Sequence, residues 1–340
     1  MPEALFESTS VFKQRFIDQL ISLLDSDQLG VFILVLANAS YREDIFTALG
    51  EQLKTHFNHW QQQLAQLKQR QNLLPVDDLK VFEQLVVTGF DQLKPTQRRQ
   101  AKGWQLQFNP LRSYRPARNS REQFNGLYQP FNPRAFHFNK PFLKPEILWQ
   151  GEHVDLDLRL LYNKFPFADY HGLMLLDPER EKPQFLSQTD CENVDRLLHA
   201  LAHLEGMGLA YNSIGAYASV NHQHWQFFIS EQDYPIEQAR WTHAGGSEPY
   251  PLPVHVAASL QAHWPLLHQF QQQDQPFNLL LRADKVYLIA RKPQGNYTHS
   301  RWSGGFAWSE VMGNVTVSGE DEYRQIDAAD ITAELLRLKP

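Results

Sequence analysis

The segment YNSIGAYASVNHQHWQFF, residues 211–228, joins a loop of small residues to a run in which polar and aromatic side chains alternate. In a β-strand, every second side chain projects from the same face. If the second half of the segment is a strand, His222, His224 and Gln226 share one face and the residues between them share the other. The segment therefore predicts a strand surface that carries two imidazoles and an amide, backed by aromatic packing.

Such a surface is suited to attack on phosphorus. An imidazole nucleophile must be neutral, rigidly aimed and held in one tautomer. An amide two residues further on can donate a hydrogen bond to a phosphate oxygen as negative charge builds up. We therefore expect His224 to be the nucleophile and Gln226 to assist it, although alternating histidines also occur on ordinary polar sheet faces.

The loop before the histidines has the composition of a phosphate-binding turn. Its residues Asn212, Ser213 and Gly215 are small or polar, so their backbone N–H groups can approach a phosphate closely. The same residues also form ordinary turns.

A metal site is the competing interpretation of the histidines. No acid or cysteine lies at ligand spacing from His222 and His224, and the chain has one cysteine, Cys191. A second pair, His199 and His203, has one-turn helical spacing and is expected on the exposed face of its helix. The sequence therefore predicts neither a metal nor another cofactor.

Bulk composition places the chain among ordinary globular proteins. It has 340 residues, of which 42% are hydrophobic and 21% charged. The single cysteine excludes an intramolecular disulfide and suits a reducing compartment, and the first residues lack the pattern of a signal peptide, so a cytoplasmic location is expected. The net charge of −6 argues against nucleic-acid binding, and the apolar run 31–39 is too short to cross a bilayer, so no membrane partner is expected. The oligomeric state is not predicted.

Positive charge is concentrated in one stretch. Residues 94–144 contain eleven Lys or Arg residues and one acid, Glu122. Such a stretch either binds an anion, for which phosphate is the obvious candidate, or is a solvated connector.

The hydrophobic pattern divides the chain into two regions. Residues 1–93 show helical periodicity and form an accessory helical region, with another helix expected to open after Pro75. Residues 94–340 form the second domain, in which many prolines and short apolar runs favour strands. Strands are expected at 104–108, 156–162 and 173–176, a helix at about 190–207 capped by Thr189 or Asp190, and a hairpin from 277–281 and 286–290. This order predicts an α+β fold built on antiparallel sheet.

Several segments of the sequence resemble a known family. The pattern His-x-His-x-Gln after the Asn-Ser-x-Gly loop resembles the transferase branch of the histidine triad superfamily, and residues 211–228 are most similar to GDP-L-galactose phosphorylase and GDP-D-glucose phosphorylase. The pieces YQPFNPRAFHFNK (128–140), DYPIE (233–237) and PFNLLLRADKVYLIARK (276–292) agree in order. The resemblance covers residues 104–318 and implies a histidine-triad-like sheet with flanking helices. A duplicated unit fits this fold, and it needs no exact sequence repeat.

The resemblance also implies roles for single residues. His224 would accept the nucleotidyl group, His222 would orient it through its backbone carbonyl and packing, and Gln226 would favour transfer over hydrolysis. Asn212, Ser213 and Gly215 match the loop beside the phosphates, and Asn163 matches an asparagine near the ribose. A nucleotide-side strand is matched by Phe136, Phe138 and Lys140, although core packing also explains the two phenylalanines. Tyr170-His171-Gly172 departs from the order in the relatives, which gives His171 no implied role.

The leading hypothesis is phosphorolysis of a GDP-hexose to GDP and hexose 1-phosphate through a nucleotidyl-histidine. Its partners would be a nucleoside diphosphate sugar and orthophosphate, with Arg134 or Lys140 offsetting the phosphate charge. A dinucleoside polyphosphate phosphorylase and a UDP-hexose uridylyltransferase are alternatives with the same intermediate. A non-catalytic nucleotide-binding module that engages a partner through its helices is an alternative from another class.

Overall fold

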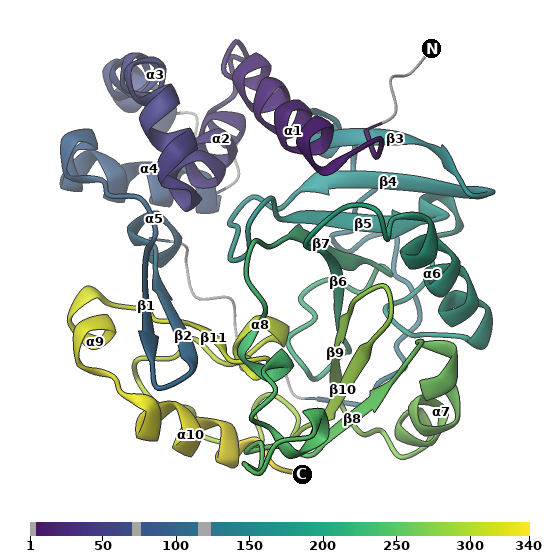
Figure 1. The fold of residues 1–340 in the computed structure, drawn as a ribbon. Coiled ribbons are helices and arrows are strands. Elements are labelled where there is room, and N and C mark those ends of the chain that lie inside the picture. The colour runs from purple at the N-terminus through teal and green to yellow at the C-terminus, as the bar shows by residue number, and fades with distance from the viewer. Residues whose placement is uncertain (1–4, 70–75, 115–123) are drawn as a thin grey trace.

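An eight-stranded sheet lies at the centre of the protein in the computed structural model, which describes residues 5–69, 76–114 and 124–340. Its strands lie in the order β3-β4-β5-β7-β6-β9-β10-β8, and the pairings between them are antiparallel (Figure 1). In that order their bounds are Ile147–His153, Leu156–Tyr162, Gly172–Leu176, Trp225–Ile229, Met207–Asn212, Phe277–Leu281, Val286–Ala290 and Val254–Ala257. The predicted α+β class is confirmed, as are the strands expected at 104–108, 156–162 and 173–176 and the hairpin β9–β10.

The central strands β6, β7 and β9 are buried along their whole length because both faces of the sheet are covered. Leu209 of β6 belongs to the hydrophobic cluster that contains Val194 and Leu197 of α6 (Gln188–Ala200). The next residue, Ala210, belongs to a second cluster with Trp308. Successive side chains of one strand thus enter different cores, as the twofold alternation of a strand requires.

A smaller sheet and the C-terminal helices build the second core. The small sheet has the order β1-β2-β11, in which β11 (Asn314–Thr316) runs parallel to β2 (Trp104–Phe108) and β1 is Gln97–Ala101. Apart from α6, the α-helices that follow residue 94 are α5 Pro110–Ser113, α7 Trp264–Gln272, α8 Trp308–Val311, α9 Glu320–Gln325 and α10 Ala328–Arg337. Sequence periodicity did not reveal β1, because its residues QRRQA carry almost no apolar signal.

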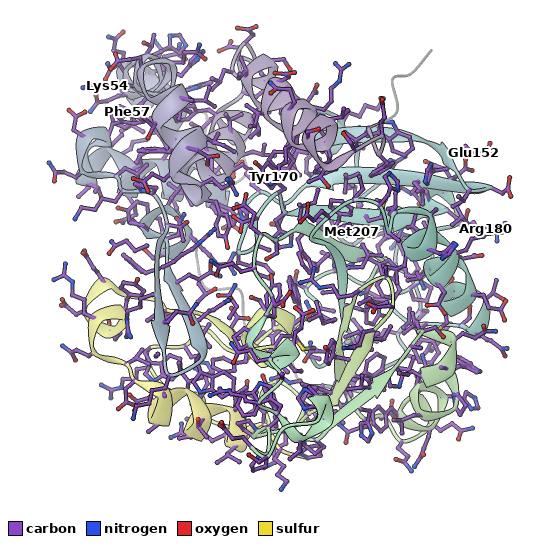
Figure 2. The ribbon with its side chains drawn as sticks, viewed as in Figure 1. Lys54, Phe57, Glu152, Tyr170, Arg180 and Met207 are labelled. Atoms are coloured by element: carbon purple, nitrogen blue, oxygen red, sulfur yellow. The ribbon has the colours of Figure 1, made fainter. Side chains whose placement is uncertain are left out.

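The predicted helical region is confirmed. Its helices are α1 Thr9–Leu23, α2 Leu29–Tyr41, α3 Glu43–Gln69 and α4 Val76–Thr88, whereas the expected opening residue Pro75 lies outside the described residues. Figure 2 shows Phe57 within this helical layer and Tyr170 where the layer meets the sheet. The division between residues 93 and 94 stays a prediction, although buried side chains from both of its sides share one hydrophobic cluster.

Helix α6 is shorter than predicted. It ends at Ala200, and the chain turns through Gly206, whose φ is +77°, into β6. The cap is Ser187 and not the expected Thr189 or Asp190: its hydroxyl accepts from the Asp190 N–H, and the Asp190 carboxylate accepts from the Ser187 N–H, which completes a capping box. The buried side chains of α6 are those at helical spacing, and they continue past its end: Val194, Leu197, Leu198, Leu201 and Leu204. His199 and His203 are exposed as expected, although His203 lies in the turns after the helix.

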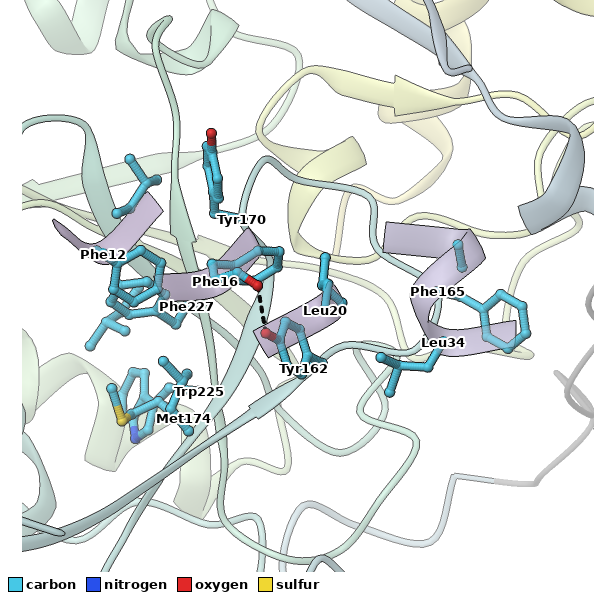
Figure 3. Packing of buried hydrophobic residues seen from close by; sticks show 14 of the residues in the cluster. Phe12, Phe16, Leu20, Leu34, Tyr162, Phe165, Tyr170, Met174, Trp225 and Phe227 are labelled. Carbon is cyan, nitrogen blue, oxygen red and sulfur yellow. Dashed lines mark hydrogen bonds between the residues drawn. The ribbon is translucent and has the colours of Figure 1, made fainter. Parts of the chain in front are cut away.

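One buried hydrogen bond joins the first helix to the sheet. The hydroxyl of Tyr162 on β4 donates to the carbonyl of Phe16 on α1 at 2.7 Å (Figure 3). The ring of Phe12, one turn earlier, lies 5.0 Å from the ring of Phe227 on β7. Helix α1 is therefore docked by aromatic packing and by a polar contact that water does not reach.

We expect Tyr162→Phe to lower the free energy of unfolding by about 1 kcal/mol, because this hydrogen bond is lost without a change in shape. Urea unfolding followed by circular dichroism measures the difference. Tyr128→Phe, at a hydroxyl on an exposed side chain, is the matched control and should change stability little. Equal effects of the two substitutions would show that the Tyr162 hydroxyl contributes nothing specific.

Candidate active site

The two histidines lie just before a strand and not within one. Strand β7 begins at Trp225, so the prediction that His222 and His224 are strand residues is wrong. A side chain takes the place of the missing strand pairing: Gln184 accepts from the His224 N–H at 2.9 Å and donates to the His224 carbonyl at 3.2 Å. The same amide donates to the Asn212 carbonyl at 3.0 Å, which ties the end of β6 to the histidine segment. Sequence reasoning missed Gln184, which is 40 residues away along the chain.

The alternation of faces is nevertheless retained. Gln223 points away from the histidines and donates to the Phe185 carbonyl and to the carboxylate of Asp190 at the start of α6. His224 and Gln226 both line a cavity, whereas His222 packs behind it.

One hydrogen bond fixes the tautomer of His224. Its Nδ1 lies 2.7 Å from the His222 carbonyl oxygen, and a carbonyl can only accept, so Nδ1 carries the proton and Nε2 keeps its lone pair. No hydrogen bond to Nε2 comes from the described residues. Burial lowers the pKa of His224 to about 4, so the ring is neutral at physiological pH.

His222 has the opposite tautomer. Its Nδ1 accepts from the backbone N–H of Phe138 at 3.2 Å, which places the ring proton on Nε2. Burial lowers its pKa to about 4, with help from His224 and His137. The His222 ring stacks on Phe138 with centroids 5.8 Å apart, so it packs against the cavity wall that contains His224.

Gln226 is oriented by a histidine that the sequence left without a role. His171, wholly buried, accepts from the Phe167 N–H through Nδ1, so its Nε2–H donates to Gln226 Oε1 at 2.7 Å. Burial lowers the pKa of His171 to about 3, which keeps this donor in one neutral form. With its oxygen occupied, Gln226 has its amide N–H groups left to donate into the cavity. Asn163 lies beside this pair, 3.4 Å from the His171 ring nitrogen.

The cavity beside His224 has a volume of about 1670 Å³. That exceeds the few hundred to about 1000 Å³ of an ordinary small-molecule pocket, so a nucleotide sugar fits. Asn163, Phe136 and Phe138 line it, together with residues of the N-terminal helices and of segments 217–220 and 303–305.

The predicted phosphate loop is only partly at the cavity. Asn212 lines it, but its side-chain oxygen accepts from Asn278 at 2.7 Å and from the Trp308 N–H at 2.9 Å. Ser213 and Gly215 are not in the lining. The Ser213 hydroxyl accepts from the Phe277 N–H, and Gly215, at φ +79°, lies so close to the Phe124 ring that a Cβ would approach it to 2.6 Å.

The segment matched to a nucleotide-side strand is a series of turns between residues 131 and 140, so that expectation is wrong. Phe138 is buried with its ring 5.0 Å from His224, and Phe136 is about half exposed at the cavity wall. Lys140 donates to the Pro133 carbonyl, and neither Lys140 nor Arg134 is in the cavity lining.

Other cations line the cavity instead. Arg112, which belongs to the basic stretch, donates to the Phe165 carbonyl at 2.6 Å and lies 4.7 Å over the ring of Phe167. Lys164 pairs with Asp78 at 2.6 Å. Residues 115–123 of the basic stretch, including Arg115, Arg118, Arg121 and Glu122, lie outside the described residues.

Within the described ranges, no three His, Cys, Asp or Glu side chains are grouped to hold a metal ion, and no helix is long and apolar enough to span a bilayer.

Residues 99–228 match the family model of the GDPGP1-like, N-terminal domain. This range contains the complete His-x-His-x-Gln segment, and the resemblance inferred from the sequence is confirmed. Human GDP-D-glucose phosphorylase 1 is 30% identical over 152 residues, which cover 41% of this chain and 37% of the relative. The zebrafish (Danio rerio) enzyme of the same name is 27% identical over 143 residues, 41% of this chain and 40% of the relative. The matches thus span less than half of either relative.

The fold is shared over more of the chain. The crystal structure of yeast Ap4A phosphorylase Apa2 superimposes with a TM-score of 0.50 over 77% of this chain and 94% of that one, at 13% sequence identity. This likeness confirms the histidine-triad-like fold. The duplication of a unit within it stays a prediction.

The hydrogen bonds predict opposite tautomers for the two histidines. At pH 6 we expect His224 to be protonated on Nδ1 and His222 on Nε2, and both rings to gain a second proton only near pH 4. Nitrogen-15 NMR of histidine-labelled protein distinguishes the two forms, and His224→Gln and His222→Gln spectra assign the signals. A proton on Nε2 of His224 at pH 6 would contradict the assigned geometry.

Proposed function

We propose that this protein transfers a nucleotidyl group through a nucleotidyl-histidine, and that its reaction is the phosphorolysis of a GDP-hexose to GDP and hexose 1-phosphate. The observation that carries the proposal is the neutral His224 at the wall of the large cavity, with its Nδ1 proton held by the His222 carbonyl. The match of residues 99–228 to the GDPGP1-like domain supports the choice of a GDP-sugar.

In the first step, the lone pair of His224 Nε2 attacks the α-phosphorus. The bond from phosphorus to the bridging oxygen breaks, and hexose 1-phosphate leaves with the electron pair and needs no proton. The ring becomes cationic as the N–P bond forms, and the His222 carbonyl, 2.7 Å from Nδ1–H, stabilises that charge without reorganising.

In the second step, an oxygen of orthophosphate attacks the phosphorus of the nucleotidyl-histidine. The N–P bond breaks, GDP leaves, and the electron pair returns to Nε2, which restores the neutral ring. Gln226 donates to the phosphoryl oxygens in both steps, because His171 holds its oxygen away from the substrate. Arg112 supplies positive charge at the cavity wall in place of Arg134 and Lys140.

The two enzyme alternatives keep this chemistry and change only the substrate. Dinucleoside polyphosphate phosphorolysis is what the name of the yeast protein states for that protein, and UDP-hexose uridylyl transfer uses the same intermediate. A non-catalytic module is disfavoured by the tautomer of His224, since passive nucleotide binding does not require a bare ring nitrogen. A cytoplasmic location, and orthophosphate as the second substrate, belong to the same proposal.

We expect His224→Ala to form GDP from GDP-glucose and phosphate at least about 10⁴-fold more slowly than the unchanged protein, because the group proposed to carry the nucleotidyl intermediate is removed. Chromatography of released nucleotides measures the rate. His199→Ala, at an exposed histidine outside the cavity, is the matched control and should keep full activity. Equal rates for the His224→Ala and unchanged proteins would remove His224 from the mechanism.

We expect His171 and Gln226 to act as one unit. Gln226→Ala should lower kcat about 10²-fold or more, and His171→Phe should lower it by a smaller factor with little change in KM, because the amide is misaligned and not removed. When His171→Phe is added to Gln226→Ala, kcat should then fall almost no further. Steady-state kinetics of the unchanged protein, the two single variants and the double variant test this. Fully multiplicative losses would show that His171 does not act through Gln226.

A further inference from the structure

A line of aromatic rings leads away from His224 along one wall of the cavity. Phe138 lies 5.0 Å from the His224 ring, Phe136 lies 5.9 Å from Phe138, and Phe142 lies 6.2 Å from Phe136, measured between ring centroids. Phe136 and Phe142 are 47% and 59% exposed, which is unusual for phenylalanines that line a concavity. Flat apolar surface beside a phosphate-reacting group suits a nucleobase, which stacks on aromatic rings.

The same chain segment ends in a carboxylate without a partner. Glu146 closes the 3-10 helix Pro141–Glu146 and lines the cavity, and no described residue gives it a hydrogen bond or an ion pair within 4 Å. The nearby cation Lys164 is committed to Asp78, at 2.6 Å. Burial raises the pKa of Glu146 to about 7, although the charge of Lys164 opposes the rise, and the charge of Asp78 adds to it. Since an unpaired carboxylate is costly to desolvate, its presence here indicates that a ligand supplies the donors.

The N-terminal helices complete this end of the cavity. Asp78 comes from α4 and is 4% exposed, and its second oxygen has no donor among the described residues. Gly30 of α2 makes room for the pair, because a Cβ there would lie 2.6 Å from that oxygen and 3.2 Å from Lys164 Nζ. Lys164 directly follows Asn163, the residue predicted to lie near the ribose. The end of the cavity that contains Glu146 and Asp78 is therefore next to that residue.

Nucleobases differ in what they offer to a carboxylate. Guanine presents two neighbouring donors, N1–H and the 2-amino group, which match the two acceptor oxygens of an ionised carboxylate. Hypoxanthine keeps N1–H and lacks the 2-amino group. Adenine turns an acceptor nitrogen toward the same position, where a carboxylate repels it.

We propose that Glu146 is the residue that selects guanine, accepting from N1–H and the 2-amino group of a base that stacks on Phe136 and Phe142. This inference rests on the proposed function for its substrate. It gives the N-terminal helices a role in specificity, because Asp78 of α4 forms the ion pair with Lys164, in a space that Gly30 of α2 leaves open, and Lys164 makes no ion pair within 4 Å with Glu146.

The test compares GDP-glucose with IDP-glucose, which differ only in the 2-amino group. We expect kcat/KM to be about 10-fold or more higher for GDP-glucose with the unchanged protein, as for a well-placed bidentate base contact, and the ratio to fall close to one in Glu146→Gln. Glu152→Gln makes the same chemical change at an exposed position on β3 that is not in the cavity lining and that lies at the edge of the view in Figure 2, and it should keep the unchanged ratio.

The pattern of results separates the two proposals. Turnover of neither substrate by the unchanged protein would overturn the proposed function. Turnover of GDP-glucose with the same ratio in the unchanged and Glu146→Gln proteins would overturn the role of Glu146 alone. An equal preference for both substrates in the unchanged protein would overturn it without any need for a variant to fold.

The pH dependence gives an independent readout. Below pH 7 the carboxyl of Glu146 becomes protonated and loses one acceptor, so KM for GDP-glucose should rise as the pH falls from 8 to 6. The same change should be absent in Glu146→Gln and retained in Glu152→Gln. A KM that is flat across this range in the unchanged protein would contradict the proposal.

Discussion

The proposed chemistry of this protein depends on the hydrogen bond between His224 Nδ1–H and the carbonyl of His222. It decides which ring nitrogen keeps its lone pair, and it is made within a single turn of backbone that no strand pairing supports. The surrounding structure holds that turn from several sides. Gln184 binds both backbone groups of His224, and Gln223 reaches the capping box of α6. A local contact between residues two apart thus requires side chains from segments dozens of residues away.

Burial keeps the histidines of this site uncharged. The imidazoles of His171, His222 and His224 all have pKa values held well below the ordinary value, and desolvation is the main cause in each case. Neutral rings have defined donors and acceptors, so each histidine can align the next group without changing its charge. In such a low-dielectric setting a donor that is already aimed at the substrate stabilises developing charge more strongly than water does.

The N-terminal helical region packs against the sheet and contributes to the lining of the cavity. Its first helix is joined to the sheet by the Tyr162 hydroxyl and by aromatic packing, and α2 and α4 reach the cavity beside His224 through Gly30 and Asp78. The family model covers residues 99–228 and so does not include these helices. The cavity beside His224 is therefore lined in part by residues from outside the matched range.

The sequence by itself determined the elements with strong local signals. Helical periodicity located the N-terminal helices, the apolar runs located β9 and β10, and the alternation around His224 indicated which side chains share a face. It could not locate Gln184, His171 or Lys164, because their roles arise from contacts between segments far apart in the chain. It also pointed to Arg134 or Lys140 as the cation beside the phosphates, whereas Arg112 from the same stretch lines the cavity. Residue type and spacing show what chemistry a segment can perform, but only tertiary packing decides which groups are desolvated, which are already paired and which remain free to meet a substrate.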